Sequence, residues 1–114
     1  MKYNLNDLEL NVIHWSQQRG ILDNSTASQQ FLKLVSEMGE LADNIAKGRD
    51  VRDDIGDCLV VLTNIAALSN TDLTECFTFA YDDIKDRMGY LNSNGVFIKE
   101  GDVAPSHAER MCDV

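Results

Sequence analysis

The chain has 114 residues, of which 44% are hydrophobic and 7% aromatic, and its 10 basic and 19 acidic side chains give a net charge of −9. This length fits one domain with a single, mostly aliphatic core. The acidic balance argues against broad binding to nucleic acids or anionic membranes, which attract dense positive charge. The longest strictly apolar run, 58–62, is far shorter than the roughly 20 residues that span a bilayer. Three cysteines without a CxxC pair suit a reducing compartment. We therefore expect a soluble, cytoplasmic protein.

Helical periodicity dominates the chain as far as residue 88. Apolar spacing predicts helices over 5–19, 26–47, 50–69 and 72–88, separated by glycines and capping residues. Their apolar stripes, expected to face the core, include Trp15, Phe31, Cys76 and Phe77. Asn94-Gly95 then predicts a hairpin turn. The expected fold is all-α, a four-helix bundle-like core with an antiparallel helical hairpin. It forms one domain over 1–102, with a short C-terminal hairpin and a flexible tail over 103–114.

Four acidic residues stand out in the second and third predicted helices. Glu37 and Glu40 lie three residues apart, as do Asp54 and Asp57, so each pair shares one helix face. Both cross-helix pairs, Glu37 with Asp57 and Glu40 with Asp54, are centred on position 47, where Lys47-Gly48 predicts the turn of a helical hairpin. The two pairs should therefore face each other.

Converging carboxylates near a core repel one another unless a cation lies between them. Oxygen ligands without His or Cys favour Mg²⁺, or Mn²⁺, over Zn²⁺. A single ExxE is more often a solvated face, and Asp50 and Asp53 fit the ordinary preference of helix N-termini for acids. Gly39 and Gly56 lie inside predicted helices, where each glycine destabilises the helix by about 1 kcal/mol relative to alanine. Close helix approach, or room for a ligand, would explain them.

These residues carry a family resemblance. The segment 33–41, KLVSEMGEL, followed by Asp54-Ile55-Gly56-Asp57, resembles the paired acidic motif of the MazG-like, all-α nucleoside triphosphate pyrophosphatases, especially short bacterial and phage-type members. Weaker similarity extends over about 8–102 and includes the segments 14–15, 19–21, 84–87 and 95–100. The resemblance implies Mg²⁺-dependent hydrolysis of a (deoxy)nucleoside triphosphate to the monophosphate and pyrophosphate, in nucleotide pool cleaning. It implies a homodimer or a dimer of dimers, which the apolar run 59–62 also favours because it covers more than one helix face.

The resemblance assigns Glu37, Glu40, Asp54 and Asp57 as metal ligands, with Glu37 or Glu40 activating water. Asp54 stands where the family usually has Glu, Ser36 where many members have Glu, and Asp83 where a lysine is common. The cations available for phosphates are Lys85, Arg87 and Lys99. Three further assignments stay open: Lys33 is solvated or binds phosphate, Trp15 is a core residue or a stacking platform, and His14 is a surface residue or touches nucleotide. His107, in the predicted tail, is expected to be irrelevant.

Three other functions compete with this one. An acidic helical interaction module would need no metal and would tolerate Asp57→Asn. A ferritin-like di-iron protein would need ExxH pairs, and neither histidine lies near the carboxylates in sequence. Phosphoribosyl-ATP pyrophosphohydrolase has a similar set of acidic residues and is the close alternative within the same enzyme class.

Overall fold

The computed structural model describes residues 2–102. The helices are α1 (Leu5–Gln18), α2 (Ile21–Asn24), α3 (Ala27–Ala46), α4 (Arg52–Leu68) and α5 (Leu73–Ile84), and the hairpin strands are β1 (Gly89–Leu91) and β2 (Phe97–Lys99), followed by the 3₁₀ turn η1 (Glu100–Asp102). The chain divides into two compact units, 1–77 and 78–114. The predicted all-α fold with a small hairpin is confirmed, while a single domain over 1–102 stays a prediction. No helix of the described part is long and apolar enough to cross a membrane.

Capping side chains set the starts of α1, α3 and α5. Asn4 accepts a hydrogen bond from the Asp7 amide at the start of α1, at 2.8 Å. Thr26 and Gln29 form a reciprocal capping box at the start of α3, which satisfies two otherwise unpaired amides. Asp72 accepts from the Glu75 amide at 2.7 Å at the start of α5. Gly48, at φ +66°, supplies the left-handed conformation that follows α3.

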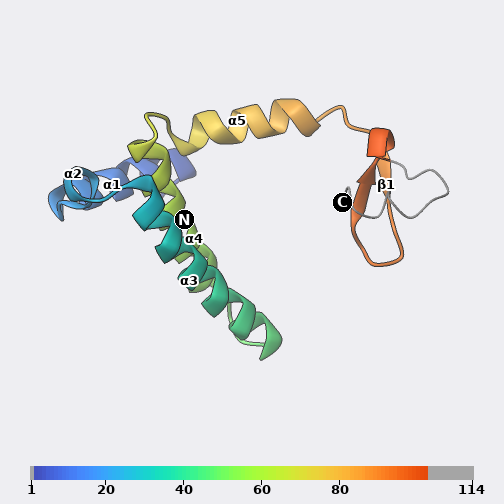
Figure 1. The fold of residues 1–114 in the computed structure, drawn as a ribbon, viewed down its shortest axis with the longest axis horizontal. Coiled ribbons are helices and arrows are strands. Elements are labelled where there is room, and N and C mark those ends of the chain that lie inside the picture. The colour runs from blue at the N-terminus through green and yellow to red at the C-terminus, as the bar shows by residue number, and fades with distance from the viewer. Residues whose placement is uncertain (1, 103–114) are drawn as a thin grey trace. The chain divides into compact units, whose positions relative to one another are not determined.

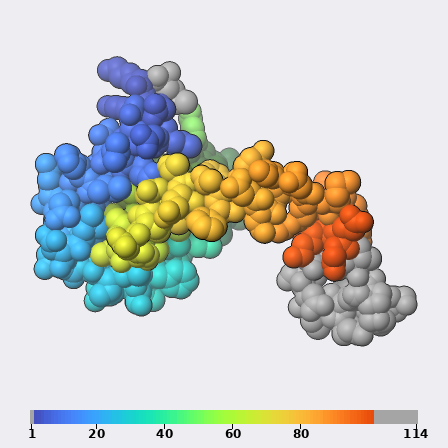
Figure 2. Space-filling model, turned by 90° about the horizontal axis from the view of Figure 1, so that it is seen from above, coloured from blue at the N-terminus to red at the C-terminus, as the bar shows by residue number. Residues whose placement is uncertain are grey.

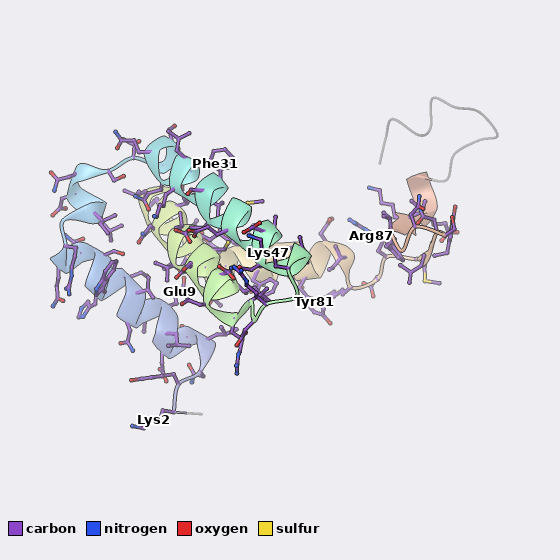
Figure 3. The ribbon with its side chains drawn as sticks, turned by 90° about the horizontal axis from the view of Figure 1, so that it is seen from below. Lys2, Glu9, Phe31, Lys47, Tyr81 and Arg87 are labelled. Atoms are coloured by element: carbon purple, nitrogen blue, oxygen red, sulfur yellow. The ribbon has the colours of Figure 1, made fainter. Side chains whose placement is uncertain are left out.

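The first unit is organised around the antiparallel pair α3 and α4, which run side by side in Figure 1. α1 packs on α4 through polar side chains. Ser16 is fully buried and donates to Asn64 Oδ1 at 2.5 Å, and Asn64 Nδ2 donates to Gln30 Oε1 at 3.1 Å. Glu9, labelled in Figure 3, accepts from the Leu73 amide and from Thr74 Oγ1. This contact fastens α1 to the first turn of α5.

The apolar stripes are much less buried than their pattern predicts. The buried hydrophobic residues of the described chain are Leu34, Val61 and Ala66. Trp15, Phe31 and Phe77 are exposed, as is Cys76, so their expected place in the core is wrong for a single chain. Figure 2 shows the helices from α1 in blue to α3 in cyan as one packed body. Amphipathic periodicity marks a face that some surface covers, and it does not specify which surface.

Two local boundaries also differ from expectation. Residues 21–24 form the short helix α2 rather than a plain turn, after Gly20 in the left-handed conformation. α5 ends at Ile84, before the predicted residue 88. The hairpin is confirmed, with Tyr90 opposite Ile98 and Gly95 at φ +75° in the turn. The predicted tail, with His107, lies outside the described residues.

Candidate metal centre

The four predicted acids lie on the two helices that form the hairpin. Glu37 and Glu40 belong to α3, and Asp54 and Asp57 belong to α4. Glu37 and Asp54 are only 7% and 8% exposed, Asp57 is half-buried and Glu40 is exposed. These four residues, hereafter the acidic quartet, therefore extend from the helix interface to the surface. The burial of two of them is unusual for carboxylates.

The quartet has the facing arrangement expected from its spacing. The carboxyl groups of Glu37, Glu40 and Asp57 are close enough to influence one another's pKa. The pKa of the Glu40 carboxyl is raised, first by its hydrogen bond with Glu37 and then by the charge of Glu37. Burial raises the pKa of Asp57, and the charges of Asp53 and Glu37 add to the effect. Negative charge is thus concentrated between α3 and α4.

Lys33 compensates part of this charge. Its Nζ lies 3.1 Å from Glu37 Oε1, one helical turn along α3. This ammonium is the largest influence on the pKa of Glu37, which is lowered. The other oxygen of Glu37, Oε2, is buried and has no hydrogen-bond partner within the described chain. A buried carboxylate oxygen without a partner is costly, and it is the strongest indication that a cation belongs here.

Asn44 holds the opposite end of the quartet. Its Nδ2 donates to Asp54 Oδ2 at 2.9 Å. The sequence reasoning did not include Asn44, although its position four residues after Glu40 placed it on the same helix face. This hydrogen bond fixes the orientation of a carboxylate one methylene shorter than the family's usual glutamate, as supporting shells of metal sites do.

The donor set fits a hard divalent cation, because all four side chains offer carboxylate oxygens. As the side chains stand, no group of three His, Cys, Asp or Glu residues within 2–102 is arranged to hold a metal ion. Binding would therefore require side-chain rotation on helices whose backbones already place the residues face to face. The role of the quartet as metal ligands stays a prediction that the partnerless Glu37 oxygen supports.

The glycines next to the quartet do not mark close helix contact. A Cβ atom built at Gly39 or Gly56 would meet nothing within 4 Å, so the explanation by close approach is wrong within this chain. Open space beside Glu40 and Asp57 is compatible with room for a ligand.

The predicted nucleotide-contacting residues of α1 are at its surface. Trp15 is 44% exposed, and the Arg19 guanidinium lies 5.2 Å from its ring centroid, so the tryptophan is not a core residue of this chain. His14 is exposed. Contact of either residue with a nucleotide stays a prediction.

The predicted phosphate-binding cations belong to the second unit. Lys85 is paired with Asp82 at 3.4 Å and Arg87 with Asp83 at 2.7 Å. Asp83, the departure from the family's lysine, therefore holds the arginine through an exposed ion pair of the kind that breaks easily. Lys99 lies on β2. Phosphate binding by these three residues stays a prediction.

Comparison with known proteins identifies the family. The sequence profile of the MazG nucleotide pyrophosphohydrolase domain matches residues 25–89, more than half of the chain and the whole acidic quartet. The chain belongs to this family. The predicted resemblance is thereby confirmed, and hydrolysis of nucleotide phosphoric anhydride bonds is the reaction class of this family.

Two similar proteins come from phages. An uncharacterised 18.2 kDa protein from the rep-hol intergenic region of Haemophilus phage HP1 is 37% identical over 70 residues, 60% of this chain and 43% of that protein. The chain thus spans less than half the length of that curated relative. A MazG-like pyrophosphohydrolase of cyanophage S-2L, bound to dGDP and three catalytic Mn²⁺ ions per active site, matches with a TM-score of 0.62. That match covers 85% of this chain and 97% of the other at 20% identity, and it shows a shared fold.

Removing the Asn44 amide should destabilise the protein through Asp54. Asn44→Ala leaves Asp54 Oδ2 buried without its donor, at a cost of about 1–3 kcal/mol. Urea unfolding in EDTA measures this loss. In an Asp54→Ala background the same change should cost much less, and equal losses in both backgrounds would contradict the interaction.

Neutralising Glu40 should stabilise the metal-free protein. Glu40→Gln removes the like charge beside Glu37, and we expect the melting temperature in EDTA to rise by about 2–5 °C. In excess Mn²⁺ the order should reverse, because the variant lacks a ligand. Asp86→Asn, at an exposed position of the second unit, is the control. A Glu40→Gln protein that melts below wild type in EDTA would contradict the repulsion.

Proposed function

We propose that the chain hydrolyses (deoxy)nucleoside triphosphates to the monophosphate and pyrophosphate with Mg²⁺, or Mn²⁺, held by the acidic quartet. The observation that supports this most is the buried Glu37 carboxylate, one oxygen of which has no hydrogen-bond partner within the described chain. Glu37 lies within the segment that matches the family. The dGDP and Mn²⁺ ions of the cyanophage protein agree with a nucleotide substrate and a divalent cation.

The members of the quartet share one proposed role, and Glu37 or Glu40 has a second. The cation is held by Glu37, Glu40, Asp54 and Asp57. Without the cation, their negative charge would repel a triphosphate. A bound divalent cation lowers the pKa of coordinated water and stabilises charge on phosphate oxygens. Glu37 or Glu40 orients the attacking water and accepts its proton. The bond between the α- and β-phosphoryl groups breaks, and pyrophosphate leaves.

The remaining substrate contacts are assigned by chemistry. Lys33 lies within one turn of the quartet and is the nearest ammonium along α3, so we place it beside the phosphates. Lys85, Arg87 and Lys99 are proposed for the distal phosphates, which requires Arg87 to leave its ion pair with Asp83. Trp15 offers an exposed ring face for base stacking, and His14 stands beside it. Pool cleaning in the cytoplasm is the proposed setting.

We propose further that the protein is a homodimer or a dimer of dimers. Phe31, Val35, Met38 and Ile45 form an apolar stripe on α3 at helical spacing, and each is at least half exposed. On α4, Val61 of the run 59–62 is buried while Leu59 and Leu62 remain exposed, which fits a helix with two apolar faces. A large contiguous apolar surface marks an interface, and a second copy of the chain offers an identical one.

The products formed from nucleotides test the function. Wild-type protein incubated with each dNTP, each NTP and phosphoribosyl-ATP, with Mg²⁺ or Mn²⁺, should yield monophosphate or its phosphoribosyl equivalent, plus pyrophosphate, on ion-exchange chromatography. Asp57→Asn should lower kcat by about 100-fold or more. Asp53→Asn, the same change four residues earlier on α4, should lower it by less than about threefold. Release of diphosphate and orthophosphate, or turnover unaffected by EDTA, would contradict the proposal.

The oligomeric state can be tested with neighbouring substitutions. Light scattering at micromolar concentration should give a dimer or tetramer for wild type. Val35→Lys places a charge in the apolar stripe and should shift the mass toward the monomer. Ser36→Lys places the same charge at the next exposed position, outside the stripe, and should not. Circular dichroism confirms that both variants keep their helices. A monomeric wild-type protein would overturn this proposal.

A further inference from the structure

The Lys33 ammonium faces several members of the acidic quartet. Its Nζ contacts Glu37 Oε1 at 3.1 Å. The pKa of Lys33 is raised, first by the hydrogen bond with Glu37 and its charge, and then by the charges of Glu40 and Asp57. The ammonium therefore lies against Glu37 and within the electrostatic influence of Glu40 and Asp57.

This ammonium satisfies the quartet incompletely. It reaches one oxygen of Glu37 and leaves the buried Oε2 without a hydrogen-bond partner. It is also only loosely held, because the Lys33 side chain is 61% exposed while that of Glu37 is 9% exposed. An ion pair whose lysine is solvated, at four-residue spacing on a helix, contributes little. At the other end of the quartet, the Asn44 amide is a neutral, part-buried group. It therefore does not compete with a metal ion as a second cation would.

We propose that the Lys33 ammonium is the resident counter-ion of the acidic quartet, and that a divalent cation displaces it from Glu37 when the site fills. The inference rests on the proposed metal site and adds a cation exchange to it. A divalent ion carries twice the charge and can satisfy Glu37 Oε2 as well as Oε1. The displaced ammonium stays tethered one helical turn away, which places it beside the cation and available to an anionic ligand.

The chain offers a matched control on the same helix. Lys47 pairs with Asp43 at 2.7 Å, also four residues apart on α3, and both side chains are half exposed. Lys33→Met and Lys47→Met therefore remove the same charge from two ion pairs of the same spacing. Only Lys33 faces the quartet. Lys33→Arg keeps the charge and separates its effect from that of side-chain packing.

Mn²⁺ titration by calorimetry without nucleotide tests the exchange. Lys33→Met should bind Mn²⁺ about three- to tenfold more tightly than wild type, because the competing cation is gone. Lys33→Arg should stay near wild type, and Lys47→Met should stay within about twofold. In thermal unfolding, Lys33→Met should melt below wild type in EDTA and at or above it in saturating Mn²⁺. The Lys47→Met difference should be equal in both conditions.

Failure of the exchange and failure of the metal site give different results. Normal Mn²⁺ binding by wild type, with unchanged or weaker binding by Lys33→Met, would overturn the exchange and leave the metal site standing. Wild-type protein that shows neither binding heat nor thermal protection with Mn²⁺ would overturn both proposals.

Discussion

The facing of Glu37 and Glu40 on α3 with Asp54 and Asp57 on α4 is the constraint on which the rest of the structure depends. Four carboxylates between two packed helices repel one another, yet Glu37 and Asp54 are almost fully buried. A protein that keeps such a destabilising arrangement uses the negative charge for a function. Lys33 and Asn44 offset part of the cost at the two ends of the quartet, and Glu37 Oε2 stays unsatisfied. The proposed binding of a divalent cation would give that cost a reason.

The same unit joins its helices through polar contacts as well as apolar ones. Ser16 and Asn64 connect α1 to α4, and Glu9 connects α1 to the start of α5. Directional hydrogen bonds specify one arrangement of the helices more strictly than interchangeable aliphatic contacts do. These polar contacts do not cover the apolar stripes on α3 and α4. The proposed assembly with a second copy accounts for the exposure of those stripes.

The charge balance links this site to its proposed substrate. A chain of net charge −9 would repel a triphosphate, so the attraction has to be generated locally. The quartet concentrates negative charge where divalent cations would offset it and bind phosphate oxygens. Lys33 as an exchangeable counter-ion extends this reasoning: the empty site is partly neutralised by the chain itself, and the same ammonium becomes available when a divalent ion takes its place.

The sequence alone determined the four long helices and the hairpin, because these follow from local spacing, capping residues and the turn at Lys47-Gly48. On the same grounds it predicted that the acids face each other. It also predicted the family, which rests on a short motif with fixed intervals. Only the tertiary structure decided which apolar residues are buried, since periodicity marks a face without naming what covers it, as Trp15 and Phe31 show. Asn44 escaped the sequence reasoning for a similar reason. An asparagine on an acidic helix face has no signature of its own, and its hydrogen bond with Asp54 exists only once α3 and α4 are packed together.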